Sequence, residues 1–405
     1  MPIAKVVDSS AADAATASGK ATRPRVRTIT AGVSLGGDDL SRVESAIAFL
    51  KRGKRAFEEA GYEVQTLRIA TDPWAAVSPA KRGALSENLR ALDRLVTENG
   101  VIVSIGPVLT ENRADPELPA WAAELVRSTR SLSLSIVVAS PQHGVHDAAI
   151  PAAAATIVQL AHALADGIGN FRFAAAANIP AGTPFFPVAW HDGPDSFAIG
   201  LESASVVERA FAELRPGAGD AEGHLERRLH EALAPVEHIA NELSQPGRLF
   251  RGIDTSPAPA KDRSIAAAIE ALTREPFGSA GTLAACSTIT AALKDTGVKT
   301  CGYCGLMLPI LEDPLLAQRA GEGRYTIRDV LLYSSVCGTG LDVVPIPGDT
   351  SAESIAGLLR DVAALSARLR KPLSARLFVV PGKKAGDLAR FNDPVLTDSV
   401  VLKLD

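Results

Sequence analysis

Short apolar runs alternate with amphipathic segments along most of the chain, and this alternation constrains the fold more than any other feature. Leu40, Val43, Ile47 and Leu50 recur at helical spacing, so they would lie on one face of a helix. The runs on either side of this segment are rich in β-branched residues, which favour strands. Strands that alternate with helices predict parallel βαβ units, and therefore an α/β protein.

The pattern continues to the C-terminus and predicts about ten strands. The expected strands are 26–35, 62–69, 101–105, 133–139, 171–178, 197–201, 249–254, 303–310, the run between Asp342 and Asp349, and 375–380. The expected helices are 39–60, 86–99, 121–129, 148–166, 203–244 with a break at 216–219, 264–272, 282–294, 327–335 and 351–369. Periodicity alone does not distinguish a closed barrel from an open sheet.

Composition narrows the classes of function. The 405 residues are 46% hydrophobic, which is enough for a large core. A net charge of −4 and 5% aromatic residues give no sign of a nucleic-acid surface. No run of eighteen apolar residues appears, so no membrane span is expected. We expect a flexible tail at 1–24, which lacks a signal-peptide core, a single domain at 25–405, and a cytoplasmic protein.

A cysteine directly before Gly-Thr-Gly marks the most unusual stretch, 336–349. The two glycines allow a tight turn whose backbone amides can face a ligand, with Thr339 and Gly340 as candidate binding residues. Asp342 follows two residues later, and two prolines fix the exit of the segment. A thiol, carboxylates and free amides so close together can support chemistry, or they can form a buried loop.

This stretch resembles the signature of the DUF711 family, also called UPF0210. Further segments that match in the same order are 27–30, 170–173, 183–187, 197–203, 252–256, 277–282, 307–313 and 381–387. The resemblance covers about residue 25 to the C-terminus. It implies the ten-stranded α/β barrel of pyruvate formate-lyase and ribonucleotide reductase, with the 336–349 loop inside. It implies architecture more directly than a reaction.

Cys337 is the first catalytic candidate, because the fold relatives carry a catalytic cysteine on a loop inside the barrel. A thiolate needs a lowered pKa, which turn amides or a nearby cation can supply. The alternative is a small buried cysteine that packs as a hydrophobe. The radical chemistry of those relatives also needs a glycine in an Arg-Val-X-Gly-Tyr context, and that sequence does not occur here. We therefore do not expect a glycyl-radical enzyme.

Cys301 and Cys304 form a C-x-x-C motif, whose spacing suits dithiol redox work or two metal ligands. No second pair follows, so a structural zinc site is incomplete. Four cysteines in this chain do not make a disulfide framework. With Cys337 nearby, three soft ligands would hold a transition metal. No cofactor is specified beyond such a divalent or transition metal.

Carboxylates near predicted strand ends form a third group, because α/β folds place their ligand sites there. Its members are Glu202, Asp254, Asp313, Asp342 and Asp349. They can act as general acid and base or hold a hard cation, and they can equally cap helices. Arg172, Lys383, Lys384 and Arg376 are the candidate anion binders.

These features together predict a non-radical enzyme that acts on a small polar, anionic metabolite. Cys337 would be nucleophile or metal ligand, and Asp342, Asp254 and Glu202 would transfer protons. One alternative is a metal- or ligand-binding protein, such as a sensor or carrier, without turnover. Another is a structural protein that forms oligomers. A small-molecule ligand and a homo-oligomer are the expected partners.

Overall fold

The computed structural model describes residues 23–35, 40–74, 82–215 and 219–404, and it is a mixed α/β protein. The tail predicted at 1–24 therefore lies almost entirely outside the described residues, as does most of the break predicted at 216–219. The strands are β1 Arg25–Val33, β2 Val64–Thr71, β3 Val101–Leu109, β4 Leu132–Ser140, β5 Gly144–Val145, β6 Phe173–Ala177, β7 Ser196–Glu202, β8 Leu249–Pro257, β9 Gly340–Pro347, β10 Leu373–Val380, β11 Leu388–Ala389 and β12 Ser399–Val400.

Helices follow most of these strands. They are α2 Ser41–Glu59, α3 Arg82–Glu98, α4 Leu118–Ser128, α5 Ile150–Ala161, the 3₁₀ segment η2 Ala165–Arg172, α6 Ala204–Ala212, α7 Ala221–Leu243, α8 Ile265–Thr273, α9 Thr282–Lys294, α10 Pro314–Gly321, α11 Ile327–Tyr333 and α12 Ala352–Leu369. Among the described helices, none combines the length and the apolar character that crossing a membrane requires.

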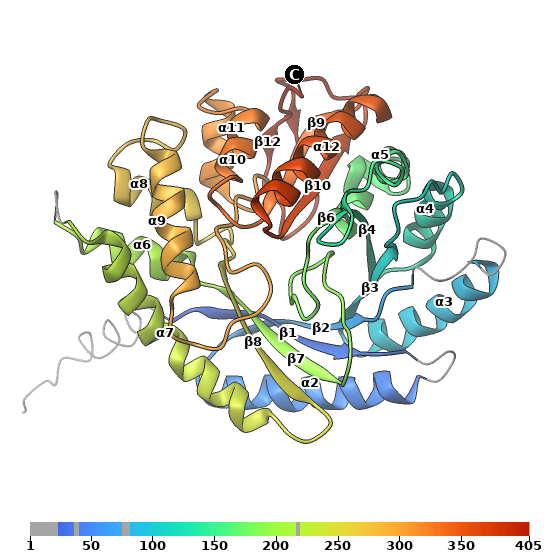
Figure 1. Ribbon diagram of the computed structural model, residues 1–405, viewed down its shortest axis with the longest axis horizontal. Helices are drawn as coiled ribbons and strands as arrows, with labels where there is room; N and C mark the ends of the chain where they lie inside the picture. The colour runs from blue at the N-terminus through green and yellow to red at the C-terminus, as the bar shows by residue number, and fades with distance from the viewer. Residues whose placement is uncertain (1–22, 36–39, 75–81, 216–218, 405) are drawn as a thin grey trace, which may run out of the picture.

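One ten-stranded sheet organises the molecule, in the order β8-β7-β1-β2-β3-β4-β6-β10-β9, with β5 paired to β4. Strands β1, β2, β3, β4 and β6 are mutually parallel, as βαβ units require. The direction reverses at β7, which pairs antiparallel with β1, and at β10, which pairs antiparallel with β6. The sheet bends strongly, so that β8 and β7 lie across the molecule from β9 and β10 (Figure 1).

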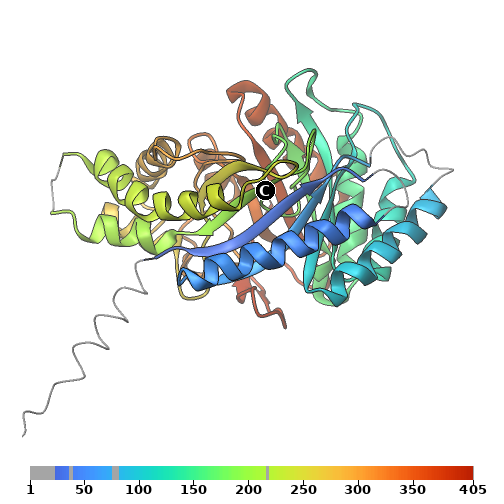
Figure 2. The ribbon, with the colours of Figure 1, turned by 90° about the horizontal axis from the view of Figure 1, so that it is seen from below.

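The main hydrophobic core lies between the outer face of this sheet and the helices that cover it. Helix α2 runs along β1 on that face (Figure 2) and buries Val43, Ile47 and Leu50, the apolar stripe seen in the sequence. Alternate residues of each strand enter this core, for example Leu373, Ala375 and Leu377 of β10. The residues between them therefore face the inside of the bent sheet.

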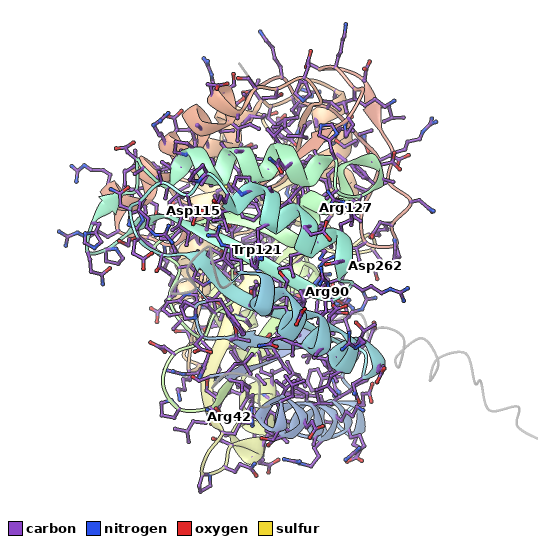
Figure 3. The ribbon with its side chains drawn as sticks, turned by 90° about the vertical axis from the view of Figure 1, so that its right-hand side faces the viewer. Arg42, Arg90, Asp115, Trp121, Arg127 and Asp262 are labelled. Atoms are coloured by element: carbon purple, nitrogen blue, oxygen red, sulfur yellow. The ribbon has the colours of Figure 1, made fainter. Side chains whose placement is uncertain are left out.

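Helices α3 and α4 lie side by side on the outer surface beyond β3 (Figure 3). Asp115, in the loop before α4, accepts hydrogen bonds from the buried guanidinium of Arg82 at the start of α3 and from Arg113. The Arg82 guanidinium also lies 5.9 Å from the ring centre of Trp121. These contacts fasten the two helices to each other, away from the inside of the sheet.

Two irregular segments fill the inside of the bend. The loop after β6 is held there by the Ser104 hydroxyl, which donates to the carbonyl oxygens of Pro187 and Ala189 at 2.9 and 2.7 Å. The segment 300–310 enters from the other side, and Tyr303 and Met307 pack with Phe185 in a second apolar cluster. The inside of the sheet is therefore a packed region with its own core.

The structure departs from the sequence prediction at the segment 303–310 and in the 336–349 stretch. Segment 303–310 is not a regular strand, although Pro309 forms one isolated parallel bridge with Asp342. Helix α10 was not expected, and it begins after Asp313, whose carboxylate accepts from the amides of Leu315 and Leu316. The strand predicted between Asp342 and Asp349 is confirmed as part of β9, so much of the 336–349 stretch, which the resemblance implies is a loop inside the barrel, belongs to the sheet.

Candidate functional site

A cavity of about 350 Å³ lies inside the bend of the sheet, which is at the lower end of the range for small-molecule sites. Its walls come from the inward-facing residues of the strands and from the two irregular segments. The charged and polar side chains are those of Arg27, Arg68, Arg130, Ser131, Ser133, Arg172, Tyr303, Glu312, Thr339, Asp342, Ser374, Arg376 and Asp393. All of the remaining lining residues are apolar.

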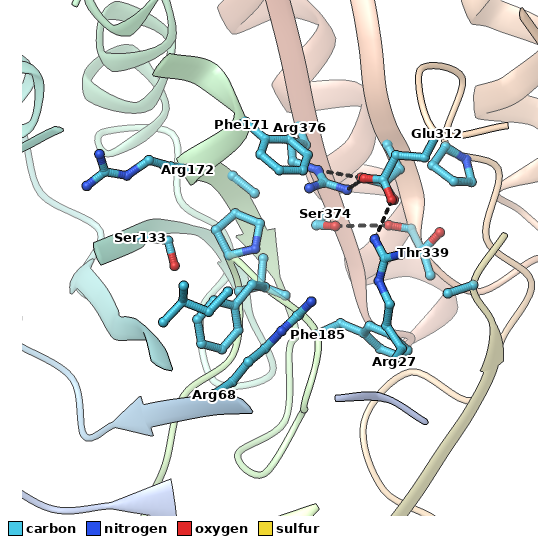
Figure 4. A pocket seen from close by; sticks show the side chains of 18 of the residues that line it. Arg27, Arg68, Ser133, Phe171, Arg172, Phe185, Glu312, Thr339, Ser374 and Arg376 are labelled. Atoms are coloured by element: carbon cyan, nitrogen blue, oxygen red, sulfur yellow. Dashed lines mark hydrogen bonds and ion pairs between the residues drawn. The ribbon is translucent and has the colours of Figure 1, made fainter. Parts of the chain in front are cut away.

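A chain of buried ion pairs forms one wall of the cavity (Figure 4). Glu312 lies at its centre and accepts from Arg27 at 2.9 Å and from Arg376 at 2.8 Å. Arg27 also donates to Glu202 at 2.6 Å, and Arg376 donates to Asp342 at 2.7 Å. The network therefore joins β1, β7, β9 and β10 through side chains of alternating charge.

A bulge in β9 aims Asp342 at Arg376. Leu341 pairs with Ala375 and Val344 with Leu377, so Asp342 and Val343 together face the single residue Arg376. Val343 has a φ of 42°, which is rare for a β-branched residue. Backbone outliers of this kind cluster at functional sites, and here one adjoins the cavity.

Asp342 carries a carboxylate suited to proton transfer. Burial raises its pKa, and the charge of Glu312 adds to this, while Arg376 opposes both. Among the described residues, its side chain has one hydrogen bond, through Oδ1 to Arg376. Glu312 behaves differently: burial opposes its ionisation, but Arg376 and Arg27 outweigh burial and hold its pKa below the ordinary value.

Arg68 differs from the other buried arginines of the cavity. Its side chain extends from β2 into the cavity beside Phe185 (Figure 4), and its guanidinium lies 4.9 Å from the ring centre of Phe186. Its Nε donates to the Thr66 hydroxyl at 3.0 Å. Within the described part of the chain, no carboxylate lies within 4.0 Å of it, whereas Arg27 and Arg376 each have two. Burial, with the charge of Arg27, lowers the pKa of Arg68 to about 9, so it remains charged at neutral pH.

A directed chain of hydroxyl groups reaches the cavity opposite Arg68. Tyr303 donates to the Ser374 hydroxyl at 2.9 Å, and Ser374 donates to the carbonyl oxygen of Thr339 at 3.1 Å. The Tyr303 oxygen is therefore free to accept a hydrogen bond from a ligand. Burial raises the pKa of Tyr303, so its hydroxyl keeps its proton.

The predicted site residues fall into two groups. Asp342, Thr339 and Arg172 line the cavity. Glu202 lies outside the lining and forms an ion pair with Arg27. Arg172 donates from its guanidinium to three carbonyl oxygens, those of Val126, Thr129 and Leu132, so its donors are engaged by the fold. Lys383 and Lys384 are exposed in the loop after β10 and are not part of the cavity lining.

Cys337 lies outside the cavity lining and is 1% exposed. Burial raises its pKa, although Lys371 opposes this effect. The Lys371 ammonium also donates to the carbonyl oxygens of Ser334 and Cys337, just after α11. This environment corresponds to the packing alternative that the sequence left open.

The glycines beside Cys337 serve close backbone packing. A Cβ on Gly338 would lie 2.2 Å from the Cα of Gly305, so two chain segments touch at this point. Gly340 has a φ of 90°, and a Cβ there would lie 2.2 Å from the carbonyl oxygen of Ser374. The amide of Gly338 donates to Leu306 at 3.2 Å, so it is not aimed at a ligand.

The C-x-x-C motif surrounds a buried carboxylate. Asp254 accepts hydrogen bonds from the amides of Tyr303 and Cys304 at 2.8 and 3.0 Å, and from Ser256. Burial raises the pKa of Cys301 and of Cys304, and the charge of Asp254 adds to this. Asp254 thereby fixes the turn that presents Tyr303 to the cavity. Among the described residues, no three His, Cys, Asp or Glu side chains are grouped as metal ligands would be.

Sequence reasoning did not single out Arg27, Arg68 or Glu312. Arg27 and Glu312 lie within segments that matched the family, but their pairing joins residues 285 positions apart. Arg68 had a local signal, because it is the charged residue of β2 and stands between Leu67 and Ile69. A buried charge in a strand is rare unless it has a partner, so it marks a position with a use.

Comparisons with known protein sequences match nearly the whole chain. The sequence profile of the family described as uncharacterised ACR (DUF711) matches residues 20–392. A UPF0210 protein of Pyrobaculum aerophilum is 33% identical over 86% of this chain and 82% of its own. A UPF0210 protein of Desulforudis audaxviator is 31% identical, over 90% and 88%. The names of these relatives state no activity. With the match extending over nearly its whole length, the chain belongs to the DUF711 (UPF0210) family.

Proposed function

We propose that the protein is an enzyme that binds a small organic anion on Arg68 and transfers a proton at Asp342. The observation that carries this proposal is the buried, charged guanidinium of Arg68 in the wall of a cavity, with no carboxylate of the described residues within 4.0 Å. A buried charge without a partner is costly, and a ligand anion supplies the missing partner through bidentate hydrogen bonds.

Asp342 supplies the chemistry in this proposal. Its raised pKa brings it closer to neutral pH, where a general acid or base works best. It lines the same cavity as Arg68 and Tyr303, so one ligand can contact all three groups. The proposed mechanism uses no thiol, because none of the four cysteines lines the cavity.

Ligand binding without turnover is the second candidate. It is favoured by the ion pairs of Asp342 and Glu312, which give both carboxylates a structural task. An enzyme would consume the bound molecule, whereas a binding protein without turnover would release it unchanged.

The test has two stages. Wild-type protein and the Arg68→Gln variant are incubated with the small-molecule fraction of cells, and bound anions are identified by mass spectrometry. We expect anions that the wild type retains and the variant does not. Each is then incubated with wild type and Asp342→Asn, which should bind it but convert it about 10²–10⁴ times more slowly. Equal retention by wild type and Arg68→Gln would contradict the anion site, and equal conversion by Asp342→Asn would contradict the proton transfer.

We also infer that the sheet closes into the ten-stranded barrel that the family resemblance implies. Two parallel backbone bridges support this, because they connect both edge strands to the segment 300–310. Ile253 of β8 bridges Thr300, and Asp342 of β9 bridges Pro309. The cavity would then be the interior of a barrel.

A further inference from the structure

We propose that the ligand is a carboxylate monoanion with an apolar body, an inference that rests on the proposed anion site at Arg68. The carboxylate would pair with the Arg68 guanidinium, and the body would lie against Phe185, Phe186 and Met307. This assigns a chemical class of substrate to the cavity.

The charge of the ligand follows from the charges around it. Arg27 and Arg376 are already paired with Glu202, Glu312 and Asp342, so they offer little uncompensated positive charge. Of the other arginines in the lining, Arg172 has its donors engaged by backbone carbonyl oxygens and Arg130 is exposed, so Arg68 is the buried arginine that remains to neutralise a ligand inside the cavity. A phosphate monoester carries about 1.5 to 2 negative charges at neutral pH, so part of its charge would remain buried without a partner. A carboxylate carries one charge and fits the planar fork of an arginine.

The apolar side chains in the cavity wall are the reason for proposing an apolar ligand body. Phe185, Val188, Tyr303 and Met307 pack together in the inner cluster, and they also line the cavity. Phe186 covers one face of the Arg68 guanidinium. A carboxylate paired with Arg68 lies in the guanidinium plane, so the rest of the ligand continues beside these side chains. Against Phe185, Val188 and Met307, polar groups on the ligand would lose their water without gaining partners, so the Tyr303 oxygen is the polar contact that this wall offers.

The test measures affinity against chain length by isothermal titration calorimetry with the full chain. The probes are acetate, butyrate, hexanoate and phenylacetate, with 1-hexanol, hexylamine and hexyl phosphate as matched compounds that change only the head group. Each added methylene should tighten Kd about fourfold until the cavity is full, as burial of a CH₂ group predicts. Hexanol, hexylamine and hexyl phosphate should bind more weakly than hexanoate.

Two variants locate the two halves of the ligand. Arg68→Gln should weaken hexanoate by at least about thirtyfold, since it removes the charged partner, and Arg90→Gln on the outer surface should not change Kd. Met307→Gln should reduce the gain in affinity for each added methylene group, whereas Met307→Leu should preserve that gain.

The outcomes separate this inference from the proposed function. If acetate, hexanoate and hexyl phosphate bind equally and all depend on Arg68, the anion site stands and the apolar monoanion is wrong. If no anion binds and Arg68→Gln changes nothing, the anion site itself fails. A rising series that depends on both Arg68 and Met307 supports the full proposal.

Discussion

Arg68 places a buried positive charge in the fold with no carboxylate within 4.0 Å among the described residues, and the more distant charges of Glu312 and Glu202 offset the cost of its burial only in part. Under the proposed function, Arg68 trades stability for ligand binding, and we expect the ligand-free protein to be more stable with an apolar side chain there. We expect Arg68→Met to raise the free energy of unfolding of the ligand-free protein by about 1–3 kcal/mol. Urea titration of both proteins measures this. Equal or lower stability of the variant would mean that Arg68 has a structural partner.

Arg376→Met is the matched comparison, since it removes a buried arginine that has two carboxylate partners. It leaves Glu312 and Asp342 with less compensation, which should cost about 3–5 kcal/mol. Opposite changes in the free energy of unfolding for the two arginine substitutions would identify Arg68 as the arginine that binds a ligand. A loss of similar size in both variants would contradict that distinction.

The thiols give a second test at the residue scale. The sequence predicts that Cys337 is the most reactive thiol provided that a pocket opens to it, but the cavity lining does not include it. Cys301 is the partly exposed cysteine of the four, and the other three are buried. Because access limits alkylation, iodoacetamide should label Cys301 before Cys337, as peptide mapping by mass spectrometry would show. Labelling of Cys337 first, with protection by a bound anion, would restore it as a site residue.

At the scale of elements, the contact between Gly305 and Gly338 joins the segment after the C-x-x-C motif to the start of β9. A Cβ on either glycine would meet the backbone of the other, so Gly338→Ala should destabilise the protein by at least about 2 kcal/mol.

Gly357 in α12 is the control for that substitution. A Cβ there meets nothing within 4 Å, and the residue lies inside a helix. Gly357→Ala should therefore raise stability by about 0.5–1 kcal/mol. Thermal unfolding of both variants checks the pair, and similar changes in both would contradict the close packing at Gly338.

At the scale of the whole molecule, Glu312 ties distant strands of the sheet together through Arg27 of β1 and Arg376 of β10. Its pKa lies below the ordinary value of 4.5 in the folded state, so its stabilising contribution is present at neutral pH. That contribution is lost as pH falls below about 4.5 toward the folded-state pKa. The contribution of Asp342 to stability changes with pH in the opposite direction, because its raised pKa favours the protonated form in the folded protein.

Unfolding free energies measured from pH 7 to pH 3 test this. We expect Glu312→Gln to be less stable than the wild type at pH 7 and the difference to shrink as pH falls. A difference that stays constant across this range would mean that the ion pairs of Glu312 add nothing to stability.

The sequence by itself determined most of the secondary structure and the class of fold. Local patterns set the strands and helices, as in α2, because the period of the apolar residues decides which face is buried. The family and nine strands of the sheet followed from the same segments, since each motif occupies a short run of the chain, whereas β5 was not predicted and 303–310 is not a strand. Proximity in the sequence also brought Asp342 and Thr339 correctly to one wall.

Only the tertiary structure decided which of these residues form a site. Whether Cys337 faces a cavity or a core depends on the approach of Gly305 to Gly338, which no local pattern encodes. Glu312 acquires its partners from strands far away in the sequence. Arg68 differs from Arg27 and Arg376 because no carboxylate of the described residues lies within 4.0 Å of it. Electrostatic environment is a property of the packed molecule, because burial and neighbouring charges arise only when distant segments meet.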